Sequence, residues 1–141
     1  MARKSKTWGY ILEMPGRPPV EKQRIALGAL GVNLGANGAA FHEVIAKGST
    51  RPQAQLEQRL ALLSAVRSGD VVVVSAPLCL GVSGKDADWF LGELQARGIS
   101  VVVNGDLERI GPGDDRAAMV DRVSRQQRVR HVQASRRRAS D

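Results

Sequence analysis

The sequence contains few of the residues that build disulfide-stapled or metal-bound folds. Its 141 residues include one cysteine, Cys79, and two histidines, His42 and His131, which are far apart. A single cysteine excludes an internal disulfide framework and a multi-cysteine metal site. We therefore expect no metal site, and nothing in the sequence predicts a cofactor.

Long apolar runs are also missing. No stretch reaches the roughly 18 to 20 apolar residues that a membrane-spanning helix needs. The apolar run that follows the basic start, Trp8 to Leu12, is too brief for a signal peptide. Together with the lone cysteine, this predicts a cytoplasmic protein that does not bind membranes.

The chain also lacks the glycine patterns that cradle phosphates. It has 15 glycines, but they form neither G-x-G-x-x-G nor G-x-x-x-x-G-K-[ST]. The glycine-rich stretch 28–38 precedes a predicted strand, whereas a phosphate loop follows one. A small-ligand or nucleotide-binding Rossmann-like domain is therefore only a second alternative.

Positive charge is abundant and lies at the two ends of the chain. The net charge is +7, with +4 in residues 1–24, −1 in residues 25–113 and +4 in residues 114–141. Basic ends attract anionic partners, although charge says nothing about the fold. We expect nonspecific phosphate contacts with DNA, if DNA is bound, from Arg3, Lys4, Lys6, Arg125, Arg128, Arg130, Arg136, Arg137 and Arg138.

The segment Val71 to Val74 is the clearest strand. Four β-branched residues between Gly69-Asp70 and Ala76-Pro77 suit a strand buried on both faces of a parallel sheet. The loop after such a strand is where open α/β sheets place their ligands. Here that loop contains no acid, base or cation from Pro77 to Val82.

The remaining pattern alternates strands with helices. Strands are predicted at Trp8–Leu12, Ala40–Ile45 and Ile99–Val103, and helices at Val20–Leu30, Gln53–Arg67 and Asp86–Arg97. The apolar residues expected to face inward are Ile25, Ala26, Ala29 and Leu30 in the first helix, Leu56, Leu60, Leu63, Ala65 and Val66 in the second, and Trp89, Phe90 and Leu94 in the third. The order predicts an α/β domain over residues 1–110, with a basic start at 1–7, a mainly parallel sheet of four to five strands and helices on both faces.

Residues 111–141 form a different unit, a basic helix and tail. The predicted helix, Arg116 to Arg138, holds eight arginines over a thin apolar stripe that is too narrow for a core helix. It suits a dimer seam, a nucleic-acid arm or a solvated tail. The residues of the proposed oligomer interface are Val120, Val123 and Val132.

Short motifs in a fixed order resemble the catalytic domain of the serine recombinases, the resolvase and invertase family. They are G-Y at Gly9, Q-R-I-A-L at Gln23, K-G-S-T-R-P at Lys47, R-S-G-D at Arg67, L-x-L-G-x-S at Leu78 and L-x-x-R-G-I at Leu94. Together they cover roughly two thirds of the chain. The resemblance implies a resolvase-like fold whose last helix self-associates and leads across the DNA minor groove toward a separate DNA-reading domain. The chain ends soon after that helix, so we expect no helix-turn-helix readout.

The family's reactive residues do not carry over. Where the family has G-Y-A-R-V-S, with an arginine that holds phosphate and a nucleophilic serine, this chain has Leu12 and Met14. Where the family has L-D-R-L-G-R-S, with an acid and two arginines, this chain has Leu78, Cys79 and Val82. Of the family's active-site arginines, only Arg51 is retained.

Phosphoryl transfer needs a nucleophile and positioned cations, and neither has an evident substitute. The neighbours of Cys79 are apolar and favour an inert thiol, while Ser75 and Ser83 suit hydrogen bonds to turn backbone. We therefore expect a catalytically inactive, oligomeric binding, assembly or regulatory protein whose partner is DNA, an active recombinase or a phage-like assembly. The main alternative is an active recombinase with non-standard catalytic residues.

Overall fold

The computed structural model describes residues 5–35, 38–45, 56–104 and 108–140, with side chains described up to residue 129. The strands are β1 (Thr7–Glu13), β2 (Ala40–Val44), β3 (Val71–Val74), β4 (Ser100–Val103) and β5 (Glu108–Ile110). The helices are α1 (Val20–Ala29), α2 (Glu57–Ala65), α3 (Gly84–Ala96) and α4 (Ala117–Ser140), with a 3₁₀ turn, η2 (Pro77–Leu80).

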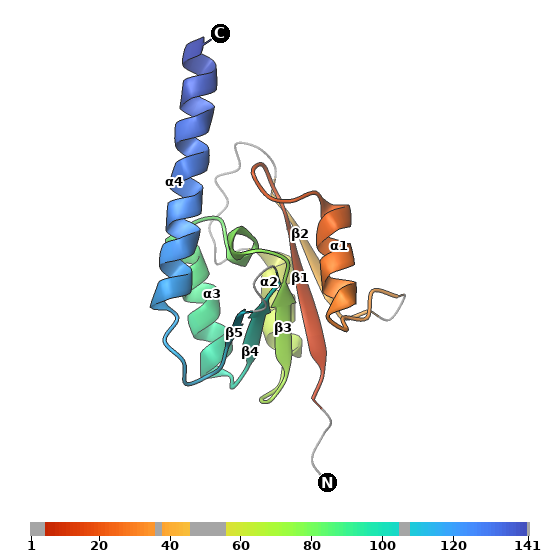
Figure 1. The fold of residues 1–141 in the computed structure, drawn as a ribbon. Helices are drawn as coiled ribbons and strands as arrows, with labels where there is room; N and C mark the ends of the chain where they lie inside the picture. The colour runs from red at the N-terminus through yellow and green to blue at the C-terminus, as the bar shows by residue number, and fades with distance from the viewer. Residues whose placement is uncertain (1–4, 36–37, 46–55, 105–107, 141) are drawn as a thin grey trace.

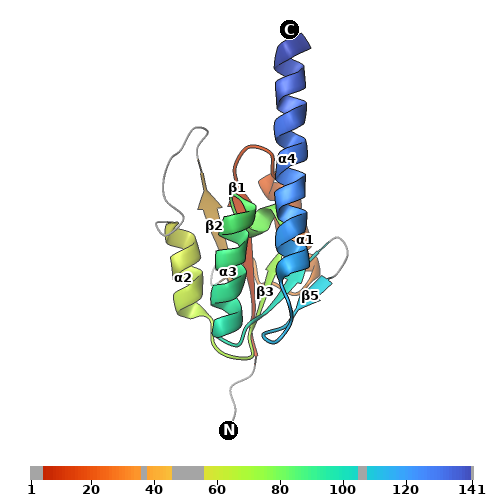
Figure 2. The ribbon, with the colours of Figure 1, turned by 90° about the vertical axis from the view of Figure 1, so that its left-hand side faces the viewer.

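The five strands form one sheet in the order β2-β1-β3-β4-β5. The first four strands are parallel, and β5 pairs antiparallel with β4. Helix α1 covers one face, whereas α2 and α3 cover the other, with α4 packed outside α3 (Figures 1 and 2). The predicted α/β class, mainly parallel sheet and helices on both faces are confirmed.

Strand β3 lies at the centre of the sheet, as its valines predicted. Val72, Val73 and Val74 are buried, because strands flank β3 on both edges and helices cover both faces. On the α3 side, Tyr10 of β1 packs against Phe90 with ring centroids 5.2 Å apart. The sheet and the helices share this one core.

The predicted inner face of α1 is wrong. Gln23 and Leu27 are the buried residues of this helix, while Ile25 is 64% exposed. The Gln23 amide accepts a hydrogen bond from Leu12 N (3.0 Å) and donates one to Leu12 O (2.8 Å). These two bonds satisfy Gln23 in the core, which an apolar pattern does not reveal.

Two further helical stripes differ from the prediction. In α2, Leu62 is buried and Leu60 is 42% exposed, and the predicted start of this helix, 53–55, lies outside the described residues. In α3, Phe90 and Leu94 are buried as predicted, whereas Trp89 is only partly buried.

Helix α4 has two structurally different parts, which we call its first half (117–125) and its second half (126–140). Its first half packs against α3 and η2 and adds Met119 and Val123 to the core, so its apolar stripe is wide enough for a core contact after all. Its second half projects beyond the body (Figure 1). At about 1.5 Å per residue, the 24-residue helix is about 36 Å long.

Candidate functional site

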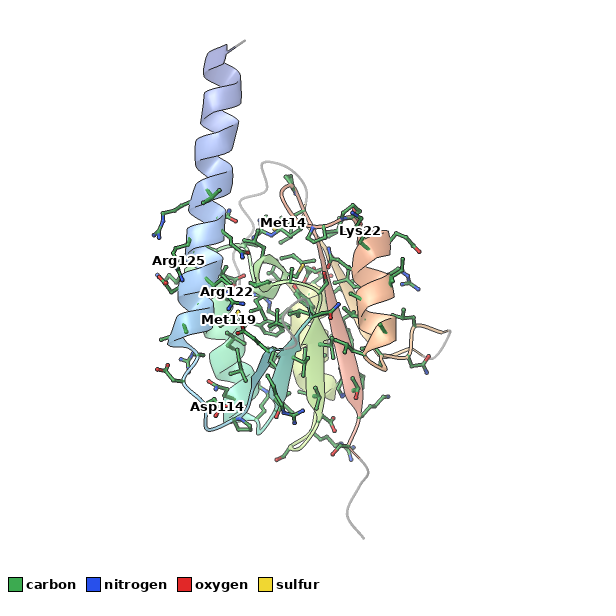
Figure 3. The ribbon with its side chains drawn as sticks, viewed as in Figure 1. Met14, Lys22, Asp114, Met119, Arg122 and Arg125 are labelled. Atoms are coloured by element: carbon green, nitrogen blue, oxygen red, sulfur yellow. The ribbon has the colours of Figure 1, made fainter. Side chains whose placement is uncertain are left out.

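The carboxyl end of the sheet, where the family's chemistry would lie, is filled with apolar side chains. Leu12, Leu78 and Cys79 are buried, and Met14 and Val82 are partly buried. Figure 3 shows Met14 at this end, just after β1. Arg51 lies outside the described residues.

Arg17 brings a positive charge to this end of the sheet from a distant segment of the chain. Arg17, in the proline-rich turn after β1, donates from Nε to Leu78 O (2.9 Å) and from Nη2 to Gly81 O (2.7 Å). The guanidinium thus holds the loop that follows β3. Because the two segments are about sixty residues apart in sequence, no local pattern indicates this contact.

Cys79 is unsuited to nucleophilic attack. Burial raises the pKa of its thiol to about 11, against the lowering effects of the Ser75 hydroxyl and the Arg17 charge. A thiol with such a pKa is protonated at neutral pH, whereas the nucleophile is the thiolate. Ser83 caps α3, because its hydroxyl accepts a hydrogen bond from Asp86 N (3.1 Å).

A hollow lies beside the ends of β1 and β2. It has a volume of about 360 Å³, and its lining is mostly apolar, with one acid and one base: Glu13, Met14, Pro15, Arg17, Pro18, Pro19, Val20, Val44 and Ile45. Glu13 Oε1 also accepts a hydrogen bond from Nε2 of the exposed His42 ring, 2.9 Å away. The described part of the hollow contains no nucleophile.

The main polar cluster of the core lies between the sheet, α2 and α3. Arg59 forms two hydrogen bonds with Asp86, and its backbone N–H donates to Glu43 Oε1 (3.2 Å). Its guanidinium carbon lies 4.8 Å from the Phe90 ring centroid and 5.7 Å from that of Tyr10. Although burial lowers the pKa of Arg59, the hydrogen bond with Asp86 raises it and the net shift is upward. Arg59 is therefore charged.

The sequence contains a pattern that indicates the burial of Arg59, although apolar periodicity alone does not reveal it. Arg59 stands three residues after Leu56 and three before Leu62, so a helical pattern places it on the apolar face. Among the described residues, the Tyr10 hydroxyl and Arg59 Nε are buried without a hydrogen-bond partner. The cluster links the sheet to the two helices α2 and α3 on one of its faces, and it opens onto no described cavity.

Three arginines at the start of α4 are paired with acids of the same chain: Arg116 just before the helix, and Arg122 and Arg125 within it. Arg116 Nε lies 2.7 Å from Asp88 Oδ1, Arg122 pairs with Glu108, and Arg125 Nε lies 3.0 Å from Asp121 Oδ2. Figure 3 shows Arg122 and Arg125 on this part of the helix. Arg125, a predicted DNA contact, thus has an acid beside it, in a pair whose side chains are 63% and 60% exposed and which is therefore weak.

The second half of α4 differs in charge. Residues 126–140 contain five arginines and no acid. Arg128 is exposed and forms no ion pair with a described residue. The side chains of Arg130, Arg136, Arg137 and Arg138 lie outside the description, as do Arg3 and Lys4, whereas Lys6 is exposed, with its ammonium 4.2 Å from the Trp8 ring centroid.

The three predicted interface valines do not form one stripe. Val123 is fully buried in the chain's own core and Val120 is partly buried against it. Positions 123 and 132 are nine residues apart, which is two and a half turns, so they lie on opposite sides of α4. Val129, 55% exposed, lies nearer the face of position 132. Of the two described valines on α4 that lie away from its start, Val129 and Val123, Val129 is the one exposed to a partner.

No group of three or more His, Cys, Asp or Glu residues that could hold a metal ion occurs in the described part of the chain. Within the same part, no helix is long and apolar enough to cross a membrane. His42 lies on the edge strand β2, and the side chain of His131 is outside the description.

No family model matches the chain, and no curated protein is significantly similar to it in sequence.

Proposed function

We propose that this chain is a catalytically inactive, resolvase-like binding and assembly module that acts in the cytoplasm and contacts DNA through the second half of α4. The observation that carries the proposal is the division of charge along this helix. Arg116, immediately before the helix, and Arg122 and Arg125 near its start are ion-paired within the chain. The helix contains five further arginines and no acid from residue 126 to its end at Ser140.

This arrangement suits a polyanion. Arginines on a helix projecting from the body can reach successive phosphates, and each contact releases counterions. Phosphate contacts position a protein on DNA and carry no direct base information. Binding should therefore be strongly salt-dependent and nearly independent of DNA sequence.

The absence of catalysis is supported by the carboxyl end of the sheet. Met14 provides only a thioether where the family has its serine, and the Cys79 thiol is buried with a raised pKa. Incubation with supercoiled plasmid should give neither cleavage nor relaxation. A covalent protein–DNA adduct would instead support the alternative of an active recombinase.

The binding test is the salt dependence of affinity for a random-sequence duplex, measured by fluorescence anisotropy. Replacing Arg136, Arg137 and Arg138 with alanine should flatten the slope of log affinity against log salt by up to about 2 to 3 units. Two single variants on the same helix make the test sharper. Arg128→Ala should flatten the slope by about 0.9. Arg125→Ala should flatten it by less, because Asp121 lies 3.0 Å from Arg125 and offsets part of its charge. Equal affinities for the parent and triple variant at every salt concentration would exclude DNA binding by α4.

A further inference from the structure

A second group of cations gathers at the amino edge of the sheet, the opposite edge from the Met14 end. Lys6 N donates to Asp70 Oδ1 and Arg67 N to Asp70 Oδ2, each at 3.0 Å. One buried carboxylate thus holds the start of β1 beside the turn that precedes β3. Gly69 N also donates to Gly98 O (3.0 Å), which brings the turn containing Arg97 to the same edge.

These three side chains present positive charge to solvent. Lys6, Arg67 and Arg97 are exposed. Neither Lys6 nor Arg67 forms an ion pair with a described residue. Arg97 pairs with Glu93 at 3.6 Å on an open helix face, where such a pair contributes little. We call Lys6, Arg67 and Arg97 the amino-edge cations.

Besides Asp70, which is buried, and Glu93, which pairs with Arg97, the described acids on this edge lie at the end near α4. Asp114 lies there (Figure 3) and accepts a hydrogen bond from Gly111 N (2.7 Å). Asp115 accepts one from Ala117 N (2.9 Å) at the start of the helix. Both carboxylates therefore serve the turn before α4, and the part of the edge formed by β1 and β3 carries the positive charge.

The segments that carry the amino-edge cations, at the starts of β1 and β3 and after α3, lie at the opposite end of the molecule from the projecting half of α4 (Figures 1 and 2). Between them, the flank of α3, α4 and β5 carries the three ion pairs of Arg116, Arg122 and Arg125. A duplex held by the second half of α4 would meet no unpaired arginine of α4 along this flank.

We propose that the amino edge is a second anion-binding surface that contacts the phosphate backbone of another duplex, so that the protein bridges two DNA segments. This inference rests on the DNA binding proposed above, and it adds a surface that α4 does not contain. Three phosphate contacts would give this second surface a salt slope of about −2.7, so bridging should be seen best at low salt.

The test is the capture of a fluorescent duplex by a biotinylated duplex on beads, in the presence of the full chain. The amino-edge variant is Lys6→Gln, Arg67→Gln and Arg97→Gln. Its control, with the same loss of charge on other exposed sites, is Lys22→Gln, Lys85→Gln and Arg109→Gln. Circular dichroism and melting temperature check that each variant folds, and anisotropy measures its binding to a single duplex.

We expect the amino-edge variant to bind one duplex like the parent but to capture at least about fivefold less of the second, while the control captures normally. Unchanged capture by the amino-edge variant would overturn the inference, because bridging would then come from an oligomer. A flatter single-duplex salt slope in that variant would overturn it too, since one duplex would touch both surfaces. A parent that binds single duplexes without capturing a second refutes bridging alone, whereas a parent that binds no DNA refutes the proposed function.

Discussion

Arg59 of α2 and Asp86 of α3 form a fully buried ion pair. The distances are 2.5 Å from Nη1 to Oδ1 and 2.8 Å from Nη2 to Oδ2, and both side chains are 0% exposed. Asp86 Oδ2 also accepts a hydrogen bond from Val82 N (2.8 Å). The pair therefore joins two helices and fixes the loop that follows the central strand.

Removing one partner of this pair should strongly destabilise the fold. Asp86→Ala leaves a buried guanidinium uncompensated, so the free energy of unfolding should fall by about 3 to 5 kcal/mol. Urea denaturation measures the change. The control is Glu93→Ala, which breaks an exposed pair with Arg97 and should cost less than about 1 kcal/mol. Similar losses in both variants would show that the buried pair has no special role.

Burial of Cys79 makes stability depend on alkaline pH. The pKa of the thiol rises from 9.0 to about 11 on folding. Above pH 9 the unfolded chain therefore loses a proton that the native chain keeps. This contribution is fully present below about pH 9 and is lost as pH rises toward about 11.

The measurement is the free energy of unfolding at several values between about pH 8 and pH 10, for the parent and Cys79→Ala. The parent should lose stability faster than the variant over this range, whatever the absolute cost of the substitution. Parallel curves would contradict the pKa assignment. In the native parent, the thiol should also react slowly with a thiol reagent at neutral pH and rapidly after unfolding.

Gly81 is required by a close approach of backbone. A Cβ at this position would lie 2.7 Å from both Ala87 N and Asp86 Oδ2. Gly81→Ala must therefore shift the loop or α3, at a cost of about 1 to 3 kcal/mol. The control is Gly113→Ala, since a Cβ there meets nothing within 4 Å. If the melting temperatures of the two variants agree, the crowding at Gly81 is relieved without cost.

The outer face of α4 should mediate self-association. Val129 is 55% exposed there, and Val132 lies on the same side of the helix. Light scattering should show a dimer or larger oligomer for the full chain and a monomer for a chain ended after Gln127, which retains the core residues Met119 and Val123. Val129→Asp should dissociate the oligomer, whereas Ile25→Asp, at a 64% exposed site on α1, should not. A monomeric full chain would end the assembly proposal.

The sequence alone was enough to predict the α/β class, the central place of β3 and the basic helix at the end. Each follows from a local property: four consecutive β-branched residues suit a strand buried on both faces, and a charge pattern is read directly from residue types. The burial of Cys79 was predictable for the same reason, because its neighbours in sequence, Leu78 and Leu80, are apolar and buried with it.

Only the tertiary structure decided which polar groups the core accepts and which cations are available to a partner. Gln23 and Arg59 are buried because Leu12 and Asp86, distant in sequence, supply their hydrogen bonds. Arg125 and Arg128 look alike in the sequence, but an acid one turn away pairs with the first. The burial and the pairing of a polar side chain depend on contacts that the chain makes only after folding. The residue type specifies only which groups could serve as its hydrogen-bond or ion-pair partners.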